Sequence, residues 1–133
     1  AELTAPMAQE LENAGFKSLK TGEEVKAALD QSGTALVVVN SVCGCAAANA
    51  RPGVRMATKH GKIPNQLLTV FAGVDRQAVE TAREYMLPFP PSSPSIALLK
   101  DGEIKFILER HNIEGRSAEM ISQDLVEAFE TYC

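Results

Sequence analysis

The chain has 133 residues and a net charge of −4, with 45% apolar and 23% charged residues. This length and composition predict one domain over residues 1–133 with a packed core, and they exclude two independent cores or wholesale disorder. The acidic balance argues against nucleic acid or an anionic membrane surface as the main partner, because both attract basic proteins. No segment resembles a membrane span or a signal peptide, so we expect a cytoplasmic protein.

The expected secondary structure follows from hydrophobic periodicity and from turn and capping residues. In the first half of the chain we expect a helix over 5–14, a brief edge strand over 16–19, a helix between Thr21 and Gly33, a buried central strand over 35–39, and a kinked or two-piece helix from 46 to about 61. In the second half we expect a strand over 67–72, a helix capped by Asp75 and an irregular connector over 88–94. A hairpin of strands 96–99 and 104–108 and a closing helix over about 117–132 complete the chain.

Three local signals support this assignment. Thr21 and Glu24 have the spacing of a capping box, in which each side chain bonds the backbone N–H of the other residue. Pro52 lacks a backbone donor and clashes with the preceding turn, so it interrupts the helix in which it lies. Asp101 and Gly102 between two apolar runs predict a tight hairpin turn.

The element order β-α-β-α-β-α-β-β-α, preceded by an extra N-terminal helix, predicts the fold class. Parallel strands joined by crossover helices, followed by an antiparallel hairpin and a closing helix, describe a mixed sheet between two layers of helices. We therefore expect an α/β protein, a three-layer α/β/α sandwich with the arrangement of the thioredoxin fold. Because a fold does not fix a function, the functional residues need a separate argument.

Two of the three cysteines, Cys43 and Cys45, flank Gly44 directly after the buried strand and before a helix. Ligands of open α/β sheets bind at this edge, and a helix N-terminus favours a thiolate over a thiol. Gly44 between them allows backbone angles that an ordinary residue would resist. A disulfide across this spacing closes a ring of roughly eleven atoms, near the limit of relaxed geometry. The pattern indicates thiol–disulfide exchange or isomerisation.

Three other interpretations of the cysteine pair remain open. The pair could be inert core, since cysteine is among the most buried residue types. It could belong to a metal-binding or metal-delivery module, with Cys133 and either His60 or His111 as further ligands, although zinc sites usually show two well-spaced ligand pairs. It could also lie in a noncatalytic interaction protein. Each of these alternatives assigns the two thiols no role in exchange.

Other residues are candidates for the same site. Pro94 precedes a strand and is either an ordinary turn residue or a cis-proline that holds the backbone beside the cysteines open to an extended chain. Arg51 is either a solvated or core-capping arginine or a residue that attracts an anionic thiol. Asn40 and Gly44 complete the candidate substrate-binding residues. Cys133 is either an exposed terminal thiol or a third exchange partner.

The segment from Asn40 to Gly53, NSVCGCAAANARPG, resembles the signature of the bacilliredoxins, a thioredoxin-like family of Gram-positive and some other bacteria. The similarity extends over nearly the whole chain, and the Cys-Gly-Cys-Ala-Ala run makes it specific. Further similar segments are Pro90–Ser95, Asp101-Gly102, Arg110-His111 and Tyr132-Cys133.

The resemblance implies a thiol–disulfide oxidoreductase and isomerase that removes bacillithiol, a small cysteine-containing thiol, from protein mixed disulfides. It implies that Cys43 is the nucleophile that takes the bacillithiol, that Cys45 resolves the resulting mixed disulfide, and that Pro94 is the cis-proline beside them. No bound cofactor or metal is implied. Bacillithiol or a similar small thiol is the co-substrate, and the partners are S-thiolated or disulfide-containing cytoplasmic proteins.

The chain also differs from thioredoxins. It has no tryptophan, and the strand over 35–39 carries no carboxylate, so the buried acid that assists the second thiol in thioredoxins is missing there. The sequence therefore assigns no proton acceptor to Cys45, and it does not give the oligomeric state.

Overall fold

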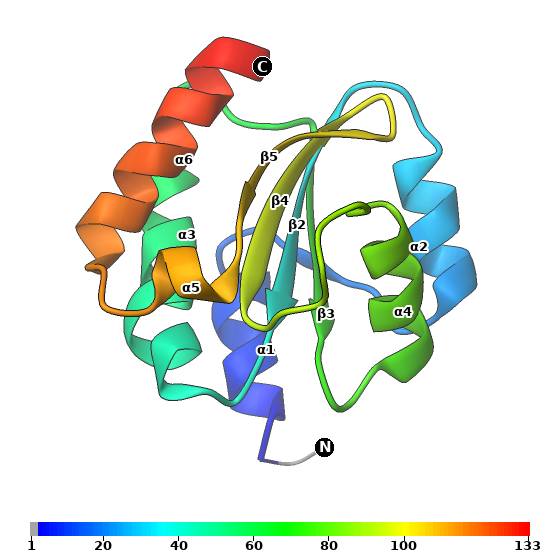
Figure 1. The fold of residues 1–133 in the computed structure, drawn as a ribbon, viewed down its shortest axis with the longest axis horizontal. Helices are drawn as coiled ribbons and strands as arrows, with labels where there is room; N and C mark the ends of the chain where they lie inside the picture. Colours follow the sequence, from blue (N-terminus) through cyan, green and yellow to red (C-terminus); the bar gives the residue numbers. More distant parts are fainter. Residues whose placement is uncertain (1–2) are drawn as a thin grey trace.

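A computed structural model describes residues 3–133; residues 1 and 2 of the expected domain lie outside the described residues. Figure 1 shows a sheet between two helical layers, with α1, α3 and α6 on one face and α2 and α4 on the other. The strands are β1 (Lys17–Ser18), β2 (Thr34–Asn40), β3 (Gln66–Phe71), β4 (Ser95–Lys100) and β5 (Glu103–Leu108). The helices are α1 (Ala5–Glu12), α2 (Gly22–Leu29), η1 (Ala46–Ala50), α3 (Arg51–Ala57), α4 (Arg76–Glu84), α5 (Arg110–Ile113) and α6 (Ala118–Tyr132).

The sheet is mixed, and β2 is its central strand, as the continuous apolar run predicts. The strand order is β1-β3-β2-β4-β5. Strand β3 pairs parallel with β1 and β2, whereas β4 pairs antiparallel with both β2 and β5. Strand β5 therefore runs in the same direction as β2. The ends of β2, β3 and β5 and the start of β4 consequently share one edge of the sheet.

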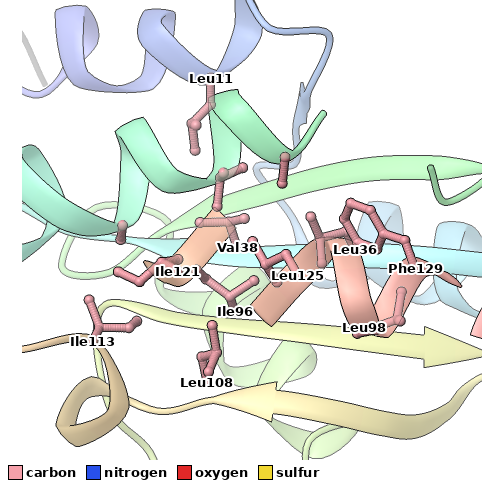
Figure 2. Packing of buried hydrophobic residues seen from close by; sticks show 14 of the residues in the cluster. Leu11, Leu36, Val38, Ile96, Leu98, Leu108, Ile113, Ile121, Leu125 and Phe129 are labelled. Atoms are coloured by element: carbon pink, nitrogen blue, oxygen red, sulfur yellow. The ribbon is translucent and has the colours of Figure 1, made fainter. Parts of the chain in front are cut away.

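Alternate residues of β2 enter different halves of the core, because successive side chains of a strand point to opposite faces. Leu36 and Val38 pack in the cluster under α1, α3 and α6. Figure 2 shows this cluster, where Leu11, Ile121 and Leu125 approach the sheet from the helices. The other face of β2 packs against α2 and α4 through Ala35, Val37 and Val39. Burial on both faces explains why β2 is apolar throughout and does not alternate with polar residues.

The capping and turn signals are confirmed. Thr21 and Glu24 form the capping box at the start of α2. The turn between β4 and β5 has positive φ at both Asp101 (53°) and Gly102 (80°), as a two-residue hairpin loop requires. The expected break near Pro52 is also present, because the π-helical segment η1 precedes α3. Within residues 3–133, no helix has both the length and the apolar character needed to cross a bilayer.

Some expected details are wrong. Helix α3 ends at Ala57 and not near residue 61, since the N–H groups of Lys59 and His60 bond carbonyls three residues back and tighten the chain into turns. Asp75 occupies the N-cap position of α4, but its side chain makes no capping hydrogen bond and lies 3.8 Å from the ammonium nitrogen of Lys20. The short helix α5 is an element that periodicity does not predict.

Candidate active site

Three chain segments meet at the edge where β2 ends. Residues 41–45 follow β2, residues 92–94 precede β4, and residues 109–114 follow β5. The strand register fixes this proximity, because Val39 pairs with Ser95 and Ile96 pairs with Leu108. Figure 1 shows α5 at the end of the molecule toward which β2 points. The two cysteines and Pro94 are therefore brought to the same edge, as the sequence predicts.

Cys43 lies where the chain turns from β2 into the following helix. Its backbone N–H donates to the Ser41 hydroxyl over 3.1 Å, which fixes the preceding loop. Its carbonyl accepts hydrogen bonds from the N–H groups of Ala46 (2.9 Å) and Ala47 (3.2 Å), so Cys43 precedes the first helical turn. The Cys43 side chain is half-buried and is therefore open to an incoming group. This placement argues against an inert core cysteine.

The two thiols have opposite pKa shifts. The sulfur atoms are 2.6 Å apart, and the Cys45 N–H donates to the Cys43 sulfur at 3.4 Å. Donation from the Cys45 thiol, then from the Cys45 N–H, lowers the pKa of Cys43, and the charge of Arg110 adds to this effect. Burial against the core raises the pKa of Cys45, and the neighbouring Cys43 sulfur raises it further. Cys43 is thus the more readily ionised thiol.

Gly44 does not use the backbone freedom that a glycine allows. Its φ is not in the positive region, which in residues 3–133 includes five other glycines. A Cβ atom added to Gly44 would meet no atom within 4 Å beyond its immediate chain neighbours. Neither backbone conformation nor close packing therefore requires glycine here. Gly44 is exposed between the two cysteines.

Asn40 and Arg51 are hydrogen-bonded to each other beneath the cysteine loop, residues 41–45. The Arg51 guanidinium donates to Glu10 Oε2 (2.7 Å), Asn40 Oδ1 (3.0 Å) and the Ser41 carbonyl (2.9 Å). Asn40 in turn donates to the Met7 carbonyl in α1 at 3.2 Å. Arg51 is 3% exposed and Asn40 is 1% exposed. This arrangement fits the core-capping interpretation of Arg51, and contact with a substrate would require the network to open.

The loop before β4 is held beside the thiols from two directions. The Ser93–Pro94 peptide bond is cis, the conformation expected if Pro94 shapes the site. Arg83 of α4 donates to the Ser92 carbonyl at 3.5 Å, and Arg110 of α5 donates to the Ser93 carbonyl at 3.4 Å. The Arg110 N–H also donates to the Ser92 hydroxyl at 3.3 Å. Side chains distant in sequence therefore fix the loop that carries Pro94.

Sequence reasoning gave no role to Arg110, whose charge acts on both thiols. Its Nε donates to Glu114 Oε1 at 2.7 Å, and the charge of Glu114 in turn raises the pKa of Cys45. The signal that could have found Arg110 is topological. The first strand of the hairpin, β4, runs antiparallel to β2, so the second strand, β5, must run parallel to β2. The residues that follow β5 therefore lie at the edge of the sheet that carries the cysteines.

Cys133, the possible third exchange partner, lies at the opposite end of the molecule. Cys133 is exposed at the end of the 15-residue helix α6, which spans about 22 Å at 1.5 Å per residue. The start of α6 lies near η1, which directly follows Cys45, because Asn49 of η1 donates to the Arg116 carbonyl. Figure 1 shows the C-terminus at the end of the molecule away from α5. Cys133 is therefore not brought to the Cys43–Cys45 pair.

The ligand set of the metal alternative is not assembled either. His60 pairs with Glu130 near the end of α6 at 2.6 Å, and His111 is exposed on α5. Among the residues that the structure describes, no three side chains of histidine, cysteine, aspartate or glutamate are grouped so that they could hold a metal ion. The geometry thus gives the metal alternative no support.

Comparisons with known proteins agree with this geometry. A family model described as disulphide isomerase matches residues 1–133. A bacilliredoxin of Cytophaga hutchinsonii is 59% identical over 93% of this chain and 92% of its own length. A bacilliredoxin of Salinibacter ruber is 52% identical over 99% of this chain and 79% of its own length. The similarity therefore includes the cysteine segment and all three loops at the edge.

Solved structures confirm the fold. The thioredoxin-like domain of Arabidopsis NCP superposes with a TM-score of 0.61 at 18% identity, covering 89% of this chain and 79% of that chain. Oxidised thioredoxin from Plasmodium falciparum superposes with a TM-score of 0.57 at 15% identity, covering 89% and 99%. The expected thioredoxin-like arrangement of a mixed sheet between helices is thus confirmed.

Proposed function

This chain belongs to the bacilliredoxin family, and from that premise we propose that it removes bacillithiol from protein mixed disulfides through Cys43 and Cys45. Family and fold together identify a thiol–disulfide oxidoreductase. The observation that carries the proposal is the pair of sulfur atoms 2.6 Å apart, one with a lowered and the other with a raised pKa. We also propose a cytoplasmic location, because reducing compartments keep such pairs as thiols.

The first step uses Cys43 as the nucleophile. Its thiolate attacks the bacillithiol sulfur of the mixed disulfide, the old S–S bond breaks, and the substrate protein leaves as a thiolate that takes up a proton. Cys43 then carries bacillithiol in a new disulfide. A lowered pKa supports this assignment, because only the thiolate attacks and a larger fraction of Cys43 is ionised at neutral pH.

The second step uses Cys45 as the resolving thiol. Cys45 loses its proton and attacks the Cys43 sulfur, which expels bacillithiol as a thiolate and leaves a Cys43–Cys45 disulfide. A raised pKa suits this later role, since Cys45 stays protonated while Cys43 reacts. Two molecules of a free low-molecular-weight thiol then reduce the pair in two successive exchanges, leaving as their own disulfide.

The surface around the thiols suits a protein substrate. Val42, next to Cys43, is 63% exposed, and Val74 after β3 is 41% exposed at the same edge of the sheet. Exposed apolar side chains beside a reactive group favour contact with a partner surface. We propose that Pro94 and its loop present backbone groups to the chain that carries the mixed disulfide, where an extended segment can pair.

A trapping experiment tests the assignment. We would mix the reduced Cys45→Ala variant with a small protein that carries bacillithiol on one cysteine, and map adducts by mass spectrometry. The expected result is a bacillithiol adduct on the Cys43 peptide that persists, because no resolving thiol is present. The matched control Cys133→Ala should instead release free bacillithiol and end with a Cys43–Cys45 disulfide.

Two other results would contradict parts of the proposal. A stable adduct on Cys45 in a Cys43→Ala variant, with none on Cys43 in Cys45→Ala, would reverse the two roles. Equal trapping rates with glutathione in place of bacillithiol would refute selectivity for bacillithiol and leave the oxidoreductase assignment intact.

A further inference from the structure

We propose that Arg110 is a specificity-determining residue that binds a carboxylate of the small thiol in the mixed disulfide, and so selects anionic thiols over neutral or cationic ones. This inference rests on the proposed function, because it concerns the group that Cys43 receives. The sequence suggested Arg51 for attracting an anionic thiol, but Arg51 is 3% exposed and bonded to Glu10, Asn40 and Ser41.

Arg110 lies at the edge of the sheet that carries Cys43. It is the first residue of α5, at the end of β5 that shares an edge with Cys43. Its backbone N–H bonds Ser92 and its Nη1 bonds the Ser93 carbonyl, so its base and its guanidinium are both held against the loop that carries Pro94. A guanidinium held in this way keeps its charge near the thiols, on which that charge acts, and does not have to reorganise on binding.

The Arg110 guanidinium keeps donors for a ligand. A guanidinium has five N–H groups in a fixed planar fork that matches a carboxylate. Within residues 3–133, the hydrogen bonds of the side chain use Nε, to Glu114, and Nη1, to Ser93, and none uses Nη2. The side chain is also 47% exposed, so a carboxylate can reach these donors.

The charges around Arg110 agree with this placement. The pKa of Arg110 lies above its ordinary value, first because Glu114 accepts from its guanidinium and second because of the nearby Cys43 sulfur. Glu114 neutralises part of the charge, but its half-exposed carboxylate is screened by water. The positive charge that favours the Cys43 thiolate is therefore also available to an anionic group attached to the sulfur under attack.

Rates of exchange with three symmetrical disulfides test the proposal. Glutathione disulfide has a net negative charge, 2-hydroxyethyl disulfide is neutral, and cystamine is cationic. We would measure the second-order rate constant for the reaction of each with the reduced protein, in wild type, Arg110→Gln and Arg55→Gln. Dividing each rate by that of the neutral probe removes any general effect of a substitution on the reactivity of Cys43.

The expected result is a loss of charge selectivity in Arg110→Gln alone. Its ratio for glutathione disulfide should fall about fivefold to tenfold, and its ratio for cystamine should rise, as removal of one steering charge from a binding rim predicts. Arg55 is a matched control, because it is 50% exposed and also paired to a glutamate, Glu10, but is not among the groups with the largest effects on the pKa of either thiol. Arg55→Gln should change neither ratio by more than about twofold.

The charge-conserving variant Arg110→Lys distinguishes electrostatic selection from a structural role. It should retain more than half of the wild-type preference, since a lysine keeps the charge and loses only the planar fork. A loss in Arg110→Lys as complete as in Arg110→Gln would overturn the proposal. Equal slowing of all three probes in Arg110→Gln would also overturn it, while leaving the proposed function standing. Failure of the reduced wild-type protein to form a Cys43–Cys45 disulfide with any of the three probes would instead overturn the proposed function.

Discussion

The two ends of the sheet contain similar kinds of residues in very different surroundings. Where β2 ends, Cys43 receives hydrogen bonds from Cys45 and lies near a guanidinium held by neighbouring loops. At the other end, Cys133 is exposed after the last helical turn, and His60 is paired with Glu130. All three cysteines are free thiols, so their chemistry differs through neighbours and not through residue type. Reactivity follows from donors and charge around a sulfur atom.

The polar side chains at the start of β2 also make different contacts from those at its end. Asn65 accepts from the Thr34 N–H at 2.9 Å, and Asp101 accepts from the Gly33 N–H at 2.7 Å. These bonds tie turns to the sheet and leave the side chains occupied. At the cysteine end, buried bonds lie beneath the loop and the sulfur atoms remain accessible. A supported but exposed thiol is what an exchange reaction requires.

The largest expected effect separates the thiols at the two ends. Cys43→Ala should lower the rate of bacillithiol removal on the order of 10²-fold or more, because the attacking atom is lost. Cys133→Ala, at the opposite end, should change the rate by less than about twofold. Release of free thiol from a mixed-disulfide substrate measures both rates. A large loss in Cys133→Ala would refute the contrast between the two ends.

A second prediction concerns two glycines near the cysteine segment. A Cβ atom at Gly53 would lie 2.7 Å from Ile121 Cγ2 and 3.0 Å from the Ala118 carbonyl oxygen, where α3 packs on α6. Gly53→Ala should therefore destabilise the fold by about 3 kcal/mol, the upper range for overpacking. Gly44→Ala, whose Cβ would meet nothing within 4 Å, should not destabilise it. Urea unfolding of both variants checks this; equal stability of the two would contradict the tight α3–α6 contact.

A third prediction tests the buried support beneath the cysteine loop. Arg51→Met should lower the free energy of unfolding by about 2 kcal/mol, because Asn40 and the Ser41 carbonyl lose a charged donor. Arg55→Met removes a half-exposed arginine that contacts the same glutamate, Glu10, and should cost less than about 0.5 kcal/mol. Thermal or denaturant unfolding compares them. Similar losses in both variants would mean that Arg51 gives the loop no special support.

The smallest expected effect is a shift within the thiol pair. Donation from the Cys45 thiol is the largest cause of the lowered pKa of Cys43, so Cys45→Ala should raise the pKa of Cys43 toward its ordinary value. At any pH below that pKa, the thiolate fraction and the alkylation rate of Cys43 should then fall. Alkylation followed by peptide mapping between pH 5 and 10 measures this, with Cys133→Ala as the control. An unchanged pH profile of Cys43 alkylation in Cys45→Ala would show that Cys45 does not lower the pKa of Cys43.

Much of the fold could be predicted because its signals are local. The residues that define a capping box, a hairpin turn or a buried strand lie within a few positions of one another, as Thr21 and Glu24 do. The break near Pro52 follows from the covalent structure of proline. The position of the cysteines at the edge of the sheet follows from their place between β2 and a helix.

The parts that the sequence could not give depend on contacts between distant residues. Arg51 is buried because Glu10, 41 positions earlier, pairs with it, and no periodicity reports such a partner. Arg110 lies at the edge of the thiols because β4 runs antiparallel to β2 and the β4–β5 hairpin reverses the chain again, and α5 is too short to produce a hydrophobic pattern. Gly44 shows the opposite case, since a glycine between two functional residues allows special backbone angles that the fold does not use.

The most direct test of the central claim is the pH dependence of Cys43 alkylation in the reduced wild-type protein. Sites can be resolved by peptide mapping, so that Cys43, Cys45 and Cys133 are followed separately. A lowered pKa predicts that the midpoint for Cys43 lies below that of free cysteine, about 8.5, and below that of Cys45 in the same sample. A Cys43 midpoint at or above that of free cysteine would contradict the account.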